Sequence, residues 1–259
     1  MQITTMGVIL REHDRDDDRV LTILTEDCGV ITAYARGAKK LRGRLLSGTE
    51  LLCCSRFVLF KYRDRYQVDS AETERNFFGL RTDVEKLALA AYLAQLCSQL
   101  APAEEPAGEF LRLTLNALHL LETDKRPPVL IKAVFELRLL SMAGYMPDLV
   151  ACRHCGQYTA ETMYFLPLSG SLLCGDCLPE VRLPDNTVRL RISPGVLTAM
   201  RHIIYSEPEK VFNFTLPLEE LKYLGDLCEY YTIVQLDRRL DSLDFYKSFS
   251  SFSVDTPTL

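Results

Sequence analysis

Residues 20–40 read VLTILTEDCGVITAYARGAKK and contain two short runs of residues that favour β-strands. Residues 20–25 and 30–35 are rich in valine, isoleucine and threonine, whose branched side chains suit an extended backbone. Residues 26–29 (EDCG) interrupt the runs with residues that are typical of a turn. The stretch therefore predicts two consecutive strands, which lead into a basic segment that contains glycine.

Three further β-rich runs flank this stretch, at residues 6–10, 51–62 and 66–71. An acidic segment at residues 11–19 and a glycine-rich, basic segment at residues 37–48 separate the runs. Five short strands so close together predict a small five-stranded barrel. The pattern predicts strands but not their pairing, so an SH3-like barrel and a sandwich remain alternatives at this point.

Beyond residue 83 the spacing of apolar residues changes to that of helices. One helix begins there, a second follows Pro106, and a third begins after the break at residues 126–128, where two prolines end the preceding helix. Ser193 and Pro194 open a further helix as N-cap and first-turn residue. A last amphipathic stretch begins at Pro217, and its apolar side consists of Leu221, Leu224, Cys228, Leu236, Leu240 and Leu243.

These changes of pattern predict a multidomain α+β protein. We expect a β domain at residues 1–80 and a helical domain in two parts, at residues 81–149 and 184–247. A cysteine-rich segment at residues 150–183 is inserted between the two helical parts. The final residues, 248–259, are rich in serine, threonine and proline, and we expect them to be disordered.

The inserted segment contains two C-x2-C pairs that are separated by 18 residues, formed by Cys152, Cys155, Cys174 and Cys177. This spacing is typical of zinc sites, in which two tight turns face each other and complete a tetrahedron of sulfur atoms. Gly156 and Gly175 lie in these turns, where glycine can adopt a positive φ without a Cβ clash. Residues 163–170 between the pairs predict a short hairpin.

Four thiolates leave no open coordination position, so we expect one structural Zn²⁺ rather than a catalytic metal. A degenerate or redox-labile site and an iron–sulfur centre are the alternatives. His154 lies inside the first pair, where a histidine is more often a polar turn residue than a ligand. The cysteine count is odd and no secretory signal is present, so we expect reduced thiols in the core at Cys28, Cys53, Cys54, Cys97 and Cys228.

The chain has a net charge of -5, but its positive charge is concentrated near the amino end. Residues 36–65 contain nine Lys and Arg against two Asp and Glu, a local charge of +7 that leaves -12 for the rest. Such a segment can follow a phosphate backbone with salt-sensitive binding, although a solvated charged face is the alternative. The candidate nucleic-acid-binding residues are Arg36, Lys39, Lys40, Arg42, Arg44, Arg56 and Lys61.

Aromatic side chains in the predicted β domain offer stacking faces for unpaired bases, although we expect most of them in the core. They are Tyr34, Phe57, Phe60, Tyr62 and Tyr66. The aspartates of the acidic segment lack the glycine and the terminal glutamate of a calcium loop, so we interpret them as an exposed acidic loop. They are Asp14, Asp16, Asp17 and Asp18.

Composition and motifs exclude several classes of protein. Hydrophobic residues make up 47% and charged residues 25% of the chain, which is typical of a folded globular protein. No run of about 18 apolar residues could span a bilayer, and the amino end lacks the features of a secretory leader, so we expect a cytoplasmic protein. We expect no enzymatic activity, because the sequence contains no phosphate loop, H-E-x-x-H motif or G-x-S-x-G motif.

The order of these parts resembles the RecO recombination mediators of bacterial DNA repair, and the resemblance covers nearly the whole chain. It rests on residues 5–10 (TMGVIL), on residues 24–40 and on residues 236–249, together with the two C-x2-C pairs. Residues 24–40 are the most specific part, because in that family a strand typically ends in small residues followed by a Gly-Ala-basic-basic sequence.

The resemblance implies an N-terminal OB-fold barrel that binds DNA and a helical domain with an inserted zinc finger. Members of the family bind single- and double-stranded DNA and anneal complementary strands in RecF-pathway homologous recombination. They act with RecR to help RecA load on DNA coated with single-stranded DNA-binding protein, whose C-terminal tail docks on the helical domain. The resemblance therefore implies a DNA-binding mediator that is not an enzyme.

Two other functions remain as alternatives. A zinc-ribbon adaptor that binds proteins but not DNA would explain the net negative charge of the chain and its extensive helical surface. An enzyme with an unrecognised site is disfavoured, because the predicted metal shell is closed.

Overall fold

The computed structural model describes residues 1–40, 43, 45–63 and 65–249 of the 259-residue chain. These residues form two compact units, which we describe separately. The first unit comprises Met1–Lys125 together with the described residues from Leu240 onward, and the second comprises Arg126–Arg239. Within the described part of the chain, no helix is both long and apolar enough to cross a membrane.

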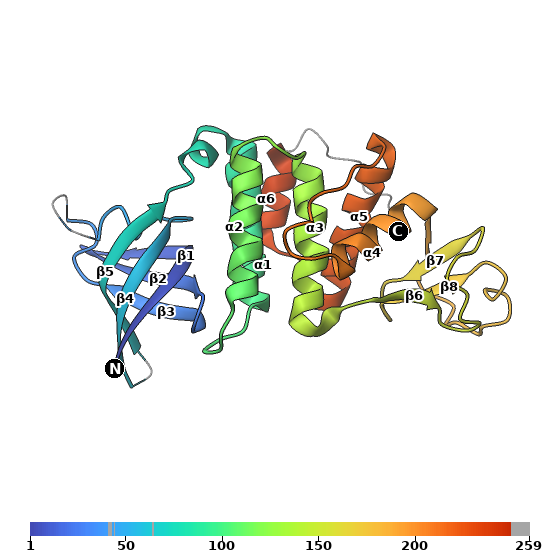
Figure 1. Ribbon diagram of the computed structural model, residues 1–259, viewed down its shortest axis with the longest axis horizontal. Coiled ribbons are helices and arrows are strands. Elements are labelled where there is room, and N and C mark those ends of the chain that lie inside the picture. Colours follow the sequence, from blue (N-terminus) through green and yellow to red (C-terminus); the bar gives the residue numbers. More distant parts are fainter. Residues whose placement is uncertain (41–42, 44, 64, 250–259) are drawn as a thin grey trace. The chain divides into compact units, whose positions relative to one another are not determined.

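The first unit begins with a closed five-stranded barrel, as predicted (Figure 1). Its strands lie in the order β1-β2-β3-β5-β4, and β4 pairs with β1 to close the sheet. Neighbouring strands are antiparallel except β3 and β5, which are parallel. This closed pairing excludes a sandwich and gives a barrel of the OB type. The strands are β1 (Gln2–Arg15), β2 (Asp18–Thr25), β3 (Gly29–Ala35), β4 (Cys54–Tyr62) and β5 (Arg65–Arg75).

Strand β1 is much longer than the predicted residues 6–10 and connects both sides of the barrel. It pairs with β4 along residues 2–8 and with β2 along residues 7–15, and its register shifts between Ile9 and Arg11. A bulge of this kind bends a strand, so the first half of β1 can pair with β4 and the second half with β2. The prediction for β4 was too long, because residues 51–53 precede the strand.

Alternate side chains of each strand fill the barrel. Ile9, Ile23 and Phe57 are fully buried in the barrel core, and along β4 the neighbours of Phe57 are exposed at Arg56 and partly exposed at Val58. This alternation follows from the period of two in a strand, which places successive side chains on opposite faces.

Three α-helices complete the described part of the first unit: α1 (Val84–Leu100), α2 (Gly108–Glu122) and α6 (Asp241–Phe249). Helix α1 begins after Asp83, whose carboxylate accepts a hydrogen bond from the Lys86 N–H. A short 3-10 helix, η1 (Phe78–Thr82), precedes it. Val84, in the first turn of α1, is exposed.

The prediction of one continuous amphipathic stretch from Pro217 to Leu243 was wrong. Helix α5 ends at Leu236, and the following Asp237 adopts a left-handed conformation with φ 51°. Leu240 and Leu243 are instead buried in the first unit, where α6 packs against α1. Helix α6 includes Ser248 and Phe249, which we had assigned to the disordered tail, and residues 250–259 lie outside the described residues.

The second unit combines three α-helices with a four-stranded sheet. The helices are α3 (Pro128–Leu140), α4 (Pro194–Tyr205) and α5 (Leu218–Leu236). A one-turn π-helix, η2 (Ser141–Tyr145), follows α3 and contains Gly144, whose φ of 94° is not helical. Ser193 caps α4 as predicted, since its hydroxyl accepts a hydrogen bond from the Val196 N–H at 3.1 Å.

The sheet of the second unit has the strand order β6-β8-β7-β9. Its strands are β6 (Asp148–Cys152), β7 (Met163–Leu166), β8 (Ser171–Cys174) and β9 (Leu190–Ile192). Strands β7 and β8 form the predicted hairpin, in which Gly170 has φ 58°. The sheet extends beyond the predicted residues 150–183 at both ends, because β6 begins at Asp148 and β9 pairs with β7.

Helices α3 and α5 pack against each other and enclose a group of charged side chains. The ammonium of Lys132 lies 3.0 Å from the carboxylate of Glu136 and 2.9 Å from that of Glu229. Lys132 and Glu136 are buried in the core of the unit. Charges so far from water must be paired, because an isolated buried charge is very costly.

Candidate metal centre and nucleic-acid interface

The four predicted metal ligands come together at one end of the small sheet. Each pair consists of a cysteine at the end of a strand and a second cysteine in the turn that follows. Their four sulfur atoms all lie within 4.8 Å of one another, and the Sγ atoms of Cys155 and Cys174 are 3.7 Å apart. Cys155 is exposed, whereas Cys152, Cys174 and Cys177 are buried.

The two turns that carry the cysteines are built differently. Gly156 has φ 75° and donates its N–H to the Cys152 carbonyl oxygen at 2.9 Å, as a tight turn around a metal requires. Gly175 does not adopt a positive φ, which corrects the prediction for that residue. Its N–H instead donates to the Thr162 carbonyl oxygen at 2.8 Å, and a Cβ there would lie only 3.3 Å from the Cβ of Thr162.

Backbone N–H groups favour a thiolate at Cys152. Burial alone would raise the pKa of this thiol, but hydrogen bonds from the N–H groups of Cys155, Cys174 and His154 outweigh burial and lower the pKa to about 6. Burial raises the pKa of Cys174, and burial together with the neighbouring thiols raises that of Cys177. The group thus favours one thiolate by itself, and four thiolates together need a cation between them.

The geometry fits a tetrahedral metal ion. Zinc–sulfur bonds of about 2.3 Å place adjacent sulfur ligands about 3.8 Å apart around a tetrahedron, and the separation of Cys155 and Cys174 is close to that. The four-cysteine group could therefore hold one metal ion. His154 is exposed and pairs with Glu180 at 3.5 Å, so it lies at the turn surface.

The side chain of Arg201, from α4, holds both flanks of the first cysteine pair. Its guanidinium donates to the carbonyl oxygens of Leu149 at 2.7 Å, Val150 at 3.0 Å and Tyr158 at 2.8 Å. It also lies over the Tyr158 ring. One planar fork therefore ties the strand before Cys152 to the segment after Cys155.

The other cysteines are mostly buried, as expected. Cys53, Cys54, Cys97 and Cys228 are buried, and only Cys28 is partly accessible. Burial raises the pKa of Cys54 to about 11 and that of Cys97 to about 12. These side chains therefore stay protonated at neutral pH and act as small apolar residues.

The predicted cations of the first unit fall into three groups. Arg36 and Lys40 are exposed and form no ion pair among the described residues. Lys39, Arg56 and Lys61 each pair with a carboxylate, namely with Asp14 at 2.8 Å, Glu74 at 3.2 Å and Glu104 at 3.2 Å. Arg42 and Arg44 lie outside the described residues.

The predicted aromatic residues divide between the core and the outer face of the barrel. Phe57 and Tyr66 are buried, whereas Tyr34, Phe60 and Tyr62 are 40%, 43% and 73% exposed. Strand register places Tyr34 and Phe60 on either side of Gln67 in one row across β3, β5 and β4. This row presents two aromatic faces to solvent.

Two arginines that were not among the candidate site residues lie next to this row. Arg65 pairs across the strands with Tyr62, and the guanidinium of Arg63 lies 5.5 Å from the centroid of the Tyr62 ring. Both are exposed, and the described residues offer neither of them an ion-pair partner. The sequence could have indicated this face, because strand alternation along β4 places Phe60 and Tyr62 on the same side of the sheet. We call Tyr34, Phe60, Tyr62, Arg63, Arg65 and Gln67 the outer aromatic face.

Two family models match the chain: Recombination protein O N terminal over residues 1–77, and Recombination protein O C terminal over residues 81–244. The chain belongs to the RecO family. The DNA repair protein RecO of Acetivibrio thermocellus is 35% identical over 247 residues, which cover 95% of this chain and 96% of the relative. The RecO proteins of Symbiobacterium thermophilum and Alkaliphilus metalliredigens are 31% and 29% identical, over 95% of this chain and 96% and 99% of theirs.

Membership in the RecO family gives the chain a role in DNA repair and recombination, as the sequence predicted. DNA and other recombination proteins are the partners that this role implies. The two family matches meet between residues 77 and 81, just before α1 begins.

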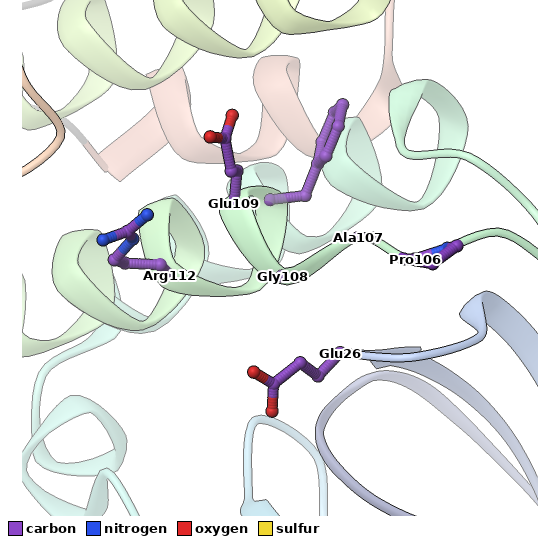
Figure 2. A pocket seen from close by; sticks show the side chains of 7 residues that line it. Glu26, Pro106, Ala107, Gly108, Glu109 and Arg112 are labelled. Atoms are coloured by element: carbon purple, nitrogen blue, oxygen red, sulfur yellow. The ribbon is translucent and has the colours of Figure 1, made fainter.

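The first unit of this RecO chain also contains a cavity of about 710 Å³ beside the first turn of α2. Figure 2 shows Glu26 facing this turn, while the side chain of Glu109 points away from Glu26. Among the described residues that line it, Arg112 is the one cation, against the two glutamates. The cavity is therefore slightly acidic and does not complement an acidic ligand.

Proposed function

We propose that this RecO-family protein is a non-enzymatic DNA-binding mediator of RecF-pathway recombination. In this proposal it binds single- and double-stranded DNA, anneals complementary strands and helps RecA load on single strands coated with single-stranded DNA-binding protein. The observation that carries the proposal is the outer aromatic face, where exposed rings lie beside arginines that have no described ion-pair partner.

The outer aromatic face has the two features that single-strand binding requires. Bases stack on aromatic rings such as those of Tyr34 and Phe60, and each stacked base contributes about 1–3 kcal/mol without regard to sequence. Arg63 and Arg65 can neutralise phosphates and release their counterions. Contacts to ring faces and phosphates leave the base edges free, so a second strand can pair with the bound one.

We also propose that the four-cysteine group holds one structural Zn²⁺. Bound there, the ion would link β6 and β8 and stabilise the fold of the small sheet. Four protein ligands leave it no position for a substrate or a water, which supports a role without enzymatic activity. The residues that would hold it are Cys152, Cys155, Cys174 and Cys177.

Membership in the RecO family supports RecR and the C-terminal tail of single-stranded DNA-binding protein as partners in this proposal. We place the protein in the cytoplasm, where these partners act. The cavity beside α2 is not assigned to the tail, since Glu26 and Glu109 would repel an acidic peptide.

A salt titration tests the DNA-binding part of the proposal. Fluorescence anisotropy of labelled single-stranded DNA should show binding at low salt that weakens steadily as salt rises. Annealing of complementary oligonucleotides, one coated with single-stranded DNA-binding protein, should be faster with the protein than without it. Absence of binding at low salt, or binding that does not change with salt, would contradict the proposal.

One observation favours the alternative of a protein-binding adaptor: Lys39, Arg56 and Lys61 already pair with carboxylates. An adaptor would capture its partners from a lysate both before and after nuclease treatment. Partners bridged by DNA would disappear after the treatment, so this comparison separates the two functions.

A further inference from the structure

The acidic turn, which we define as residues 14–18 where β1 ends and β2 begins, lies against the basic loop that follows β3. The carboxylate of Asp14 is 2.8 Å from the ammonium of Lys39. Lys39 also donates its backbone N–H to the Asp17 carbonyl oxygen at 3.1 Å. The N–H of Gly37, which has φ 64°, donates to the Asp18 carboxylate at 2.7 Å. The acidic turn and the basic loop thus meet through three contacts.

We propose that Asp14 is an internal competitor for DNA phosphate at Lys39, and that it sets the affinity and salt dependence of DNA binding. This inference rests on the proposed DNA-binding function. The Asp14 carboxylate takes the position of a phosphate oxygen on the Lys39 ammonium. Lys39 is then available only to a polyanion that displaces Asp14.

The three contacts have different roles in this arrangement. Asp17 and Asp18 bind backbone N–H groups, so they hold the shape of the loop without using a cation. Asp14 alone uses the charged end of Lys39. Removal of the Asp14 charge therefore frees the Lys39 ammonium and leaves both backbone contacts of the loop in place.

Asp14 retains a cationic neighbour when Lys39 turns to DNA. The guanidinium of Arg19 lies 3.4 Å from the Asp14 carboxylate. Hydrogen bonds from Arg19 to the Thr49 carbonyl and hydroxyl oxygens hold this arginine in place. When a phosphate replaces Asp14 at Lys39, the Asp14 carboxylate therefore still has the Arg19 guanidinium beside it.

The pair is exposed enough for DNA to break it. The side chains of Lys39 and Asp14 are 39% and 49% accessible, and exposed ion pairs hold only weakly because water and salt screen them. Binding of a DNA strand gains counterion release at each phosphate that a cation neutralises, which an internal carboxylate cannot offer. A DNA strand is therefore the stronger partner at low salt.

Neutral variants of two aspartates test this role. Asp14→Asn should raise the affinity for labelled single-stranded DNA about fivefold at 0.1 M salt and steepen the slope of log affinity against log salt by up to about 0.7, the full value of one phosphate contact, because no carboxylate then competes for Lys39. Asp16→Asn is the matched control, because Asp16 is an exposed residue of the same turn whose side chain forms no hydrogen bond or ion pair with the described residues. It removes the same charge and should leave the slope unchanged.

A second pair of variants assigns the effect to Lys39. In the parent protein Lys39→Ala should lower affinity less than it does in the Asp14→Asn background, since Asp14 competes with phosphate for the ammonium. In the Asp14→Asn background the same substitution should cancel the gain in affinity. Thermal unfolding checks that each variant is folded, and Asp14→Ser provides a second neutral side chain if Asp14→Asn lowers the melting temperature.

The results separate this inference from the function on which it rests. If the parent protein does not bind DNA at low salt, the proposed function fails. If the parent binds but Asp14→Asn and Asp16→Asn have the same slope, or Asp14→Asn weakens binding, then Asp14 does not compete with phosphate and only this inference is overturned.

Discussion

The guanidinium of Arg201 lies over the ring of Tyr158, with its central carbon 3.8 Å from the ring centroid. The same side chain donates hydrogen bonds to three carbonyl oxygens that flank the first cysteine pair. A residue of helix α4 therefore fixes the turn that carries Cys152 and Cys155, although it contributes no ligand itself.

Loss of Arg201 should speed metal release. Each of its hydrogen bonds contributes about 0.5–1.5 kcal/mol, so Arg201→Ala should lower the melting temperature and increase the rate at which a coloured chelator removes the metal. Arg201→Lys should recover only part of the loss, because an ammonium cannot form the planar fork. Arg182→Ala, an exposed arginine of the same unit, is the control. Equal release rates for Arg201→Ala and Arg182→Ala would show that Arg201 does not position the turn.

Metal removal should loosen the small sheet and expose its thiols in a definite order. Purified protein should contain one equivalent of zinc, and chelation should lower its thermal stability, because metal binding is coupled to folding there.

Alkylation followed by mass spectrometry should then modify Cys155 first, since it is the exposed member of the group. Cys54 and Cys97 should stay unmodified at pH 7 to 8, because their pKa values of about 11 and about 12 keep them protonated. Protein without bound metal, yet fully stable, would contradict a structural zinc site.

The charged group between α3 and α5 should be sensitive to the loss of its cation. Lys132→Met should destabilise the fold by about 3–5 kcal/mol, because it leaves the carboxylates of Glu136 and Glu229 beside an apolar side chain. Urea denaturation measures the change. The triple variant Lys132→Met, Glu136→Gln, Glu229→Gln should recover most of the stability. A single variant as stable as the parent would mean that this ion group contributes little to folding.

The rings of the outer aromatic face should contribute to the affinity for single-stranded DNA, whereas an exposed ring elsewhere should not. Tyr34→Ala combined with Phe60→Ala should weaken binding of single-stranded DNA by about 1–3 kcal/mol for each base that no longer stacks. Phe78→Ala removes a ring that is 66% exposed in η1, outside the outer aromatic face, and serves as the control. Anisotropy measures all three proteins, and equal affinities would remove the outer aromatic face from the binding surface.

Arginines without a described ion-pair partner should contribute more to DNA binding than paired ones. Arg63→Ala and Arg65→Ala should each reduce the magnitude of the salt slope by about 0.7, the value of one phosphate contact on a single strand. Arg56→Ala should have a smaller effect, because Glu74 already neutralises this side chain at 3.2 Å. A larger effect at Arg56 than at Arg63 or Arg65 would support Arg56 as a DNA-binding residue, as the sequence predicted, and would place the DNA on another part of the barrel.

Local features of the fold could be predicted because they depend on near neighbours in the chain. The C-x2-C spacing alone indicated a four-sulfur group, since two residues between cysteines allow one turn to point both sulfurs inward. Strand alternation and the proline break before α3 act over a few residues in the same way. The RecO resemblance then supplied the barrel type that the strand pattern left open.

The sequence by itself therefore indicated most of the elements, the four-cysteine group and the concentration of cations near the amino end. Only the tertiary structure decided which cations are neutralised: Asp14 and Lys39 are far apart in the sequence and meet because β1, β2 and β3 close into a barrel. It also placed Leu240 and Leu243 with the first unit and brought Tyr34 into line with Phe60 across β5. Strand register and ion pairing join distant residues, so they depend on the pairing of whole elements rather than on local propensity.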